Sequence, residues 1–184
     1  MSTRTRLSRG DWIAAALDAL TEGGVPAVAV EPIAKRLGVT KGSFYWHFKD
    51  RDELLAAALE TWERERTEAL IERLDSIEDP RARLAEWARH AFGADKALLV
   101  GLHAAADHPV VSPVLSRVTE RRVEWLAVLL REGGAPRSAA RRRARLLYSA
   151  DLGLFQIARV IPEEGPTESE LAALVREIQD TFMR

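Results

Sequence analysis

The chain contains no cysteine, which excludes a disulfide framework, a thiolate metal site and a cysteine nucleophile. Long apolar runs are also missing. The segment Ala97–Ala106 has ten residues and already contains Gly101 and His103, so it is too short to cross a bilayer. The first thirty residues lack the apolar core of a signal peptide. We therefore expect a cytoplasmic protein without a membrane segment.

Charge of one sign is not in excess overall, because 27 basic residues face 28 acidic ones and the net charge is −1. The distribution is uneven, however. Arg4, Arg6 and Arg9 occur without an acid in the first ten residues, and residues 35–51 contain five basic residues and only Asp50 as an acid. Local surpluses of this kind attract phosphate backbones. The N-terminal arginines fit a phosphate-binding arm and a solvated tail equally well.

Helical signals recur along all 184 residues. Ser8 with Asp11, Asp50 with Glu53 and Thr167 with Glu170 have the spacing of capping boxes. The best strand candidate, 25–30, is interrupted by proline. We expect an all-α fold of about nine helices. Those with clear limits are Gly10–Thr21, Asp50 to about Asp75, Pro80 to Gly93, Ala94–Asp107, Ser112 to Gly133, Pro136 to about Pro162, and one that follows Thr167.

The segment Val30–Arg51 has the pattern of a helix-turn-helix. Apolar residues share one face of a short first helix, and Gly38 can adopt the left-handed conformation that ends it. Thr40 is placed to cap the second helix. Phe44 and Phe48 are four residues apart, so they share a face that can pack on the first helix. Such a pair of helices also occurs in folds that do not contact DNA.

The second helix has polar and aromatic residues on its outer face. Tyr45, Trp46 and His47 are adjacent in the chain, so their side chains cannot all face inward. At least part of this cluster must be exposed beside basic residues, which favours a binding surface. Residues near the start of such a helix can reach base edges, and those that follow it can contact phosphates. The candidates are Thr40, Lys41, Ser43, Tyr45, Trp46 and His47, followed by Lys49 and Arg51.

The string IAKRLGVTKGSFYWHFKDRDELL resembles the DNA-binding signature of the TetR family of bacterial transcriptional regulators. The resemblance implies a DNA-binding domain at 1–52 and a ligand-sensing, dimerising domain at 53–184. It further implies a homodimer that binds a near-palindromic operator in double-stranded DNA, most often as a repressor released by a small-molecule effector. It gives the same eight residues as DNA contacts and implies neither enzyme activity nor a cofactor.

The sequence departs from the family pattern where the first helix of the pair begins. Many members have Ser or Thr there, followed by a basic residue, whereas this chain has Val30 and Glu31. Valine cannot donate to a phosphate, and glutamate repels the backbone. Ala29 is also a poor N-cap. We therefore expect little DNA affinity from this entry.

The second half of the chain contains the candidate effector pocket and dimer surface. Aromatic, histidine and acidic side chains could line a pocket between helices, with core packing as the alternative for each. The candidates are Trp62, Trp87, His90, His103, Trp125, Tyr148, Asp151 and Phe155, with Phe92 nearby. Asp151 lies on an apolar stripe and needs a partner, either an arginine across a dimer interface or a cationic or hydroxylated ligand.

Two further expectations concern assembly and chemistry. The helices Ser138–Ile161 and Glu168–Phe182 have wide apolar faces, so their symmetric pairing into a four-helix bundle would form a homodimer. The alternative function is a small helical metal-binding protein or enzyme that uses His103, Asp107 and His108. Their spacing is not a zinc signature. Helix-end capping is the simpler account of Asp107 and His108.

Overall fold

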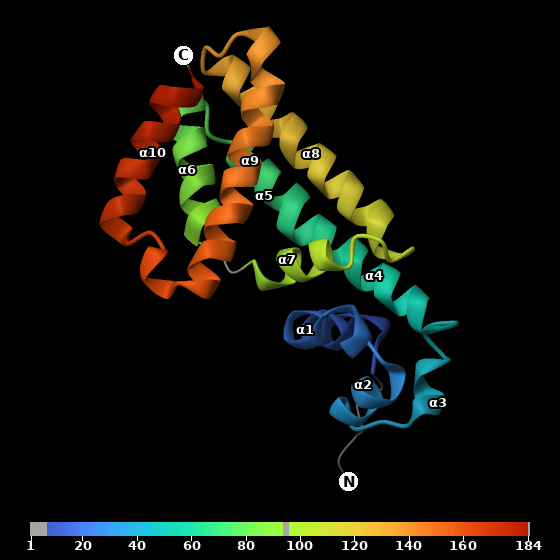
Figure 1. Cartoon of the computed structure of the whole chain (residues 1–184). Helices are drawn as coiled ribbons and strands as arrows, with labels where there is room; N and C mark the ends of the chain where they lie inside the picture. The colour runs from blue at the N-terminus through green and yellow to red at the C-terminus, as the bar shows by residue number, and fades with distance from the viewer. Residues whose placement is uncertain (1–6, 94–95, 184) are drawn as a thin grey trace. The chain divides into compact units, whose positions relative to one another are not determined.

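The computed structural model describes residues 7–93 and 96–183, and every regular element within them is helical (Figure 1). The all-α prediction is therefore confirmed. The α-helices are α1 (Arg9–Ala27), α2 (Val30–Arg36), α3 (Lys41–Phe44), α4 (Arg51–Glu63), α5 (Ala69–Asp75), α6 (Pro80–Gly93), α7 (Ala97–Ala104), α8 (Val111–Glu132), α9 (Arg137–Val160) and α10 (Glu168–Phe182). None of the described helices is long and apolar enough for a membrane span.

One long helix is interrupted by a change of helical type. The π-helical segment Arg64–Glu68 joins α4 to α5 without a break. The ten labelled helices of the described chain are therefore nine continuous segments, as the sequence predicted. The expected helix from Asp50 to about Asp75 matches α4, this π segment and α5 taken together.

The described residues form two compact units. The first contains the chain through Arg66 together with Ala97–Ser116, and the second contains Thr67–Lys96 and the chain from Arg117 onward. Packing thus groups α4 and α7 with α1, α2 and α3, whereas the functional division at residue 52 remains a prediction. In the second unit α6 lies between α9 and α10 and packs on both (Figure 1).

The predicted capping boxes form at two of the three positions. Ser8 and Asp11 cap α1 reciprocally, and Thr167 and Glu170 do the same for α10. At α4, Asp50 accepts from the backbone N–H of Glu53 at 2.9 Å. The Glu53 carboxylate, however, accepts from the backbone N–H of Lys49 at 2.7 Å instead of closing the box. Thr40 precedes α3 but makes no side-chain cap hydrogen bond, so that predicted cap is wrong.

Two helix limits differ from the sequence prediction. The expected break after Thr21 occurs at Gly23 and Gly24, where φ is −144° and +67°, but one more helical turn follows and contains Pro26. The helix expected over Ala94–Asp107 is limited to Ala97–Ala104 among the described residues, which exclude 94 and 95. It ends because the N–H of Ala105 bonds three residues back to Leu102 at 3.1 Å.

Aromatic rings form the centre of the first unit. Trp12, Phe44 and Phe48 are 0%, 0% and 2% exposed, respectively. The Phe44 ring meets Trp12 edge-on at 5.4 Å and stacks on Phe48 at 5.6 Å. Gly38 adopts φ +68°, as predicted for the turn between α2 and α3. The short α3 is thereby held against α1 by Phe44 despite its four residues.

Arg51 joins the start of α4 to the end of α1 through backbone oxygens. Its Nε donates to the Val28 carbonyl at 2.8 Å, and a terminal nitrogen donates to Val25 at 2.6 Å. Its other terminal nitrogen donates to Asp52 at 2.9 Å and lies 3.5 Å from Nε2 of His108. The Val25 carbonyl also accepts from the backbone N–H of Val28 at 3.2 Å, so the guanidinium adds a second donor there and is the donor to Val28 just after α1.

We predict that Phe44→Ala lowers the free energy of unfolding by about 3–5 kcal/mol, because it removes a fully buried ring between two others. Trp46→Ala is the matched control, since Trp46 lies two residues further on and is 80% exposed. We expect a change within about 0.5 kcal/mol for this variant. Urea unfolding followed by circular dichroism measures both. Equal losses would contradict the assignment of Phe44 to the core.

We also predict that Arg51→Met lowers the free energy of unfolding by about 2 kcal/mol, because two carbonyls lose a charged donor. Hydrogen exchange should accelerate at the backbone amides of Val28 and Ala29. Lys49→Met is the control, since the Lys49 side chain is 86% exposed. If the two variants unfolded at the same urea concentration, Arg51 would not have the structural role that its hydrogen bonds indicate.

Candidate nucleic-acid interface and buried ion pair

Two large aromatic side chains lie on the surface immediately after α3. Tyr45 is 57% exposed and Trp46 is 80% exposed, although both follow the fully buried Phe44. They lie in a turn in which the N–H of Trp46 bonds to Ser43 at 3.4 Å and that of His47 bonds to Phe44 at 2.9 Å. The buried ring fixes the turn, and the turn directs the next two aromatics outward. Exposed aromatic groups of this size indicate a contact surface.

Positive charge surrounds this aromatic pair, partly held by acids. The Lys41 ammonium donates to Glu31 at 2.8 Å, which raises the pKa of Lys41 and lowers the pKa of Glu31. Glu31, expected to repel a phosphate, is thus neutralised by a lysine that was expected to contact DNA. Lys49 is more available, because its ammonium lies 3.8 Å from Asp50 and its side chain is 86% exposed. Both pairs are exposed and therefore weak.

The remaining predicted DNA contacts differ in the exposure of their side chains and in whether those side chains already have hydrogen-bond partners. Thr40 is exposed, and Ser43 and His47 are half-buried beside the core. Arg51 is directed inward to backbone carbonyls, as described above, so its donors are already engaged. The structure therefore places seven of the eight predicted residues on one continuous segment, 40–49, and gives the eighth an intramolecular partner set.

The N-terminal arm is described only at its end. Arg9 pairs with Glu53 at 3.4 Å, and its guanidinium carbon lies 4.6 Å above the Phe48 ring. Arg4 and Arg6 lie outside the described residues. Arg9 thus belongs to the surface of the first unit and not to a free tail.

The predicted effector residues divide between the two units. Trp62 and His103 belong to the first, where Trp62 is buried and His103 Nδ1 lies 2.8 Å from the Leu99 carbonyl oxygen. The other predicted residues belong to the second unit, and most of these are buried. They are Trp87, His90, Trp125, Tyr148, Asp151 and Phe155.

Asp151 has a partner that the sequence analysis did not identify. Its Oδ1 accepts from the ammonium of Lys96, and both side chains are buried, with exposed fractions of 6% and 9%. The predicted arginine across a dimer interface is therefore replaced by a lysine of the same chain. Burial raises the pKa of the Asp151 carboxyl, and Lys96 opposes this rise, as do the more distant Arg122 and His90.

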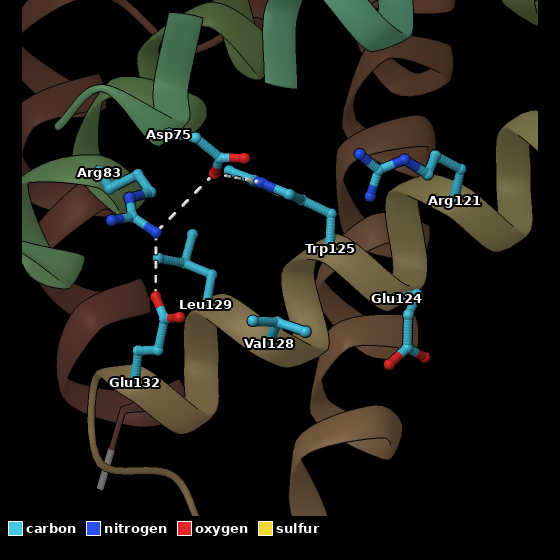
Figure 2. A pocket seen from close by; sticks show the side chains of 8 residues that line it. All are labelled: Asp75, Arg83, Arg121, Glu124, Trp125, Val128, Leu129 and Glu132. Carbon is cyan, nitrogen blue, oxygen red and sulfur yellow. Dashed lines mark hydrogen bonds and ion pairs between the residues drawn. The ribbon is translucent and has the colours of Figure 1, made fainter. Parts of the chain in front are cut away.

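Trp125 lies at a different part of the second unit, beside a pocket of about 290 Å³ (Figure 2). Its indole N–H donates to Asp75 at 2.9 Å, and Arg83 bridges Asp75 at 3.8 Å and Glu132 at 2.9 Å. These polar groups hold one another. Of the predicted effector residues, Trp125 alone lines this pocket, together with charged side chains and with Val128 and Leu129.

The alternative metal site is not assembled. Among the described residues, no group of three histidine, aspartate or glutamate side chains is placed to hold a metal ion. His103 turns back to its own helix at Leu99, and His108 Nδ1 accepts from the N–H of Val110 at 3.2 Å. The described structure therefore does not bring His103, Asp107 and His108 together as a group that could hold a metal ion.

Sequence reasoning missed Lys96 and Arg122. Arg122 donates to the hydroxyl of the buried Thr67 at 3.0 Å and contributes to the field at Asp151. Lys96 could have been noticed as the one charged residue directly before the apolar stretch Ala97–Ala106. Its distance of 55 residues from Asp151 gave no local signal for the pairing.

Known proteins are similar to this chain in two ways. A model of the bacterial regulatory proteins of the tetR family matches residues 13–58. The class G tetracycline repressor protein of Vibrio anguillarum is 40% identical over 62 residues, which cover 34% of this chain and 30% of the repressor. The match thus spans less than a third of the repressor's length.

Solved structures extend the similarity over nearly the whole chain. A transcriptional regulator from Rhodococcus sp. Rha1 superposes with a TM-score of 0.74 and 27% identity, covering 94% of each chain. Reduced NemR from E. coli shares the fold, with a TM-score of 0.80 and 18% identity over 95% of this chain and 97% of NemR. The helix-turn-helix segment thus matches the tetR family model over residues 13–58, and nearly the whole chain shares its fold with these two proteins.

Proposed function

We propose that this protein is a DNA-binding transcriptional regulator that binds a near-palindromic operator as a homodimer and releases it when a small-molecule effector binds. The observation that carries the proposal is the exposed pair Tyr45 and Trp46, held outward by a buried neighbour and surrounded by basic groups. The match of residues 13–58 to the tetR family model supports regulation of transcription, and repression is the form we propose. A cytoplasmic location follows from this role.

The segment 40–49 is the proposed DNA-contacting surface. Thr40, Lys41 and Ser43, near the start of α3, would reach base edges in the major groove. Trp46 would pack on sugars and thymine methyl groups. Tyr45, His47 and Lys49 would contact phosphates. Arg51 would act through the position of α4, since its guanidinium is engaged within the chain.

A strip of exposed apolar residues on α9 supports the homodimer. Leu146, Ile157 and Val160 are 64%, 46% and 80% exposed, and Ile161 follows the helix with 48%. Gly153 lies between them, and a Cβ there would meet no described atom within 4 Å. Small residues allow two helices to approach closely. The apolar stripe of α10 is largely packed within its own unit, so α9 is the main proposed dimer surface.

We predict that Lys49→Ala weakens operator binding and reduces its salt dependence. Each lost phosphate contact makes the slope of log K against log salt concentration less steep by about 1. The substitution removes two such contacts from a dimer, one in each subunit. Tyr45→Phe should weaken binding with an unchanged slope, because a neutral phenol releases no counterion. Fluorescence anisotropy with a duplex selected from genomic fragments, at several salt concentrations, measures both effects.

Arg73→Ala is the charge-matched control for Lys49→Ala, since Arg73 is an exposed cation on α5 in the second unit. Its affinity and slope should equal those of the wild type. Equal slope changes for both variants would show that total charge, and not segment 40–49, governs binding. If no fragment were selected with or without candidate effectors, the proposed DNA-binding function itself would be wrong.

We predict that Val160→Glu shifts the protein from dimer to monomer, because it places a charge in the apolar strip of α9. Trp46→Glu is the matched control, since Trp46 is also 80% exposed but lies after α3. This variant should remain dimeric and lose operator binding. Sedimentation velocity at several protein concentrations reports the association state. A dimeric Val160→Glu protein would place the dimer interface elsewhere.

A further inference from the structure

The interior of the second unit contains a set of groups that together bind a cation. The Lys96 ammonium donates to the Asp151 carboxylate and to the Ala91 carbonyl. It also lies 5.9 Å from the ring centroids of both Phe92 and Phe155, within the range of cation–π attraction. A carboxylate, a carbonyl and two aromatic rings therefore converge on one positive charge, which the chain itself supplies.

The acceptor side of this arrangement is fixed, and the cation is not. Asp151 and Phe155 lie on α9, and Ala91 and Phe92 lie on α6. Lys96 lies in neither helix, since it occupies the connection just before α7. Its long side chain has several rotatable bonds, whereas the acceptors are held by helical backbone. If one member of the pair leaves, it is therefore the lysine.

Stability does not explain why the pair is present. A buried ion pair contributes about as much as an apolar pair of similar volume, because desolvation offsets the attraction. The neighbouring Tyr148 adds a second unexplained feature. Its hydroxyl is buried and has no hydrogen-bond partner in the described chain. Tyr148 and Asp151 are three residues apart on α9 and share a face, so both are directed to the same side of the helix.

We propose that Asp151, Phe92 and Phe155 form the receptor for the ammonium group of an organic cation, and that Lys96 is the resident cation which this ligand displaces. The Tyr148 hydroxyl would serve a second polar group of the ligand. That the ligand acts as an effector is the one part that rests on the proposed function. Cation binding itself does not depend on it.

Charge in the surroundings defines the competing ligand. Arg122 and His90 also act electrostatically on Asp151, so an anion held by Lys96 and Arg122 is the opposite possibility. An anion would, however, lie against the carboxylate and the negative faces of two rings. The geometry favours a cation, and the experiment distinguishes the two by the sign of the probe's charge.

The first experiment replaces the deleted side chain with a free molecule. In the full-length Lys96→Ala protein, n-propylammonium chloride supplies the atoms beyond Cβ. It should raise the thermal unfolding midpoint and bind about tenfold or more tightly than to the wild type, in which Lys96 competes. The neutral probe 1-propanol and the anionic probe butyrate should have no such effect. Lys96→Ala combined with Asp151→Asn should lose the response.

The second experiment tests displacement of Lys96 in the wild-type protein. It therefore remains possible if the Lys96→Ala variant does not fold. Tetramethylammonium chloride should accelerate the reductive methylation of Lys96, measured by peptide mass spectrometry, whereas sodium chloride at the same concentration should not. Three other lysines, Lys35, Lys41 and Lys49, are exposed and serve as internal controls with constant rates.

The outcomes separate this inference from the proposed function. Stabilisation by butyrate but not by n-propylammonium would assign the site to anions and overturn the inference. A Lys96 methylation rate that tetramethylammonium leaves unchanged would overturn the displacement. Operator binding is measured on the same preparations without either probe. If the protein binds its operator but no cation, the proposed function stands and the cation site is wrong. If it binds the cation but no operator, the cation site stands and the proposed function is wrong.

Discussion

The packing of Phe44 between Trp12 and Phe48 is the contact on which the candidate DNA surface depends. A helix of four residues has too few internal hydrogen bonds to be stable alone. Its position comes from one buried ring, which meets Trp12 at 5.4 Å. Because the chain turns directly after that ring, Tyr45 and Trp46 must face outward. Burial of Phe44 therefore causes the exposure of Tyr45 and Trp46, so the candidate binding surface depends on the packing of the core.

Local features of this fold were predictable from sequence, because their causes are local. Capping at Ser8 and Thr167 requires a partner only three residues away, and the left-handed Gly38 is determined by its own missing Cβ. Thr40 shows the limit of such reasoning. Its position before α3 was correct, but its hydroxyl forms no cap. Position in sequence fixes where a helix begins more reliably than it fixes which hydrogen bonds a side chain makes.

Non-local pairings were not predictable for a related reason. Arg51 lies within a recognisable signature, yet its partners are the carbonyls of Val28 and Val25, 23 and 26 residues away in the chain. Asp151 was identified as needing a partner, because a carboxylate on an apolar stripe cannot remain unpaired. The identity of that partner depended on the tertiary structure of the second unit, which places Lys96 beside Asp151 although 55 residues separate them. A single sequence shows that Asp151 needs a partner, but it does not identify the residue that is the partner.

The position of Lys96 gives the buried pair a consequence beyond its own site. Lys96 is the residue directly before α7, and α7 packs on α1 in the first unit. Helix α1 also carries Trp12, against which the Phe44 ring rests. Release of Lys96 from Asp151 would remove the ion pair that holds this residue in the interior of the second unit. A ligand that displaces Lys96 would thus change a restraint on the residue that directly precedes α7 in the chain. Coupling of about 1–3 kcal/mol is typical between an effector and a second site. Breaking a buried ion pair by removing one partner costs about 3–5 kcal/mol, which exceeds such a coupling, so a ligand that displaces Lys96 has to supply a cation of its own to Asp151.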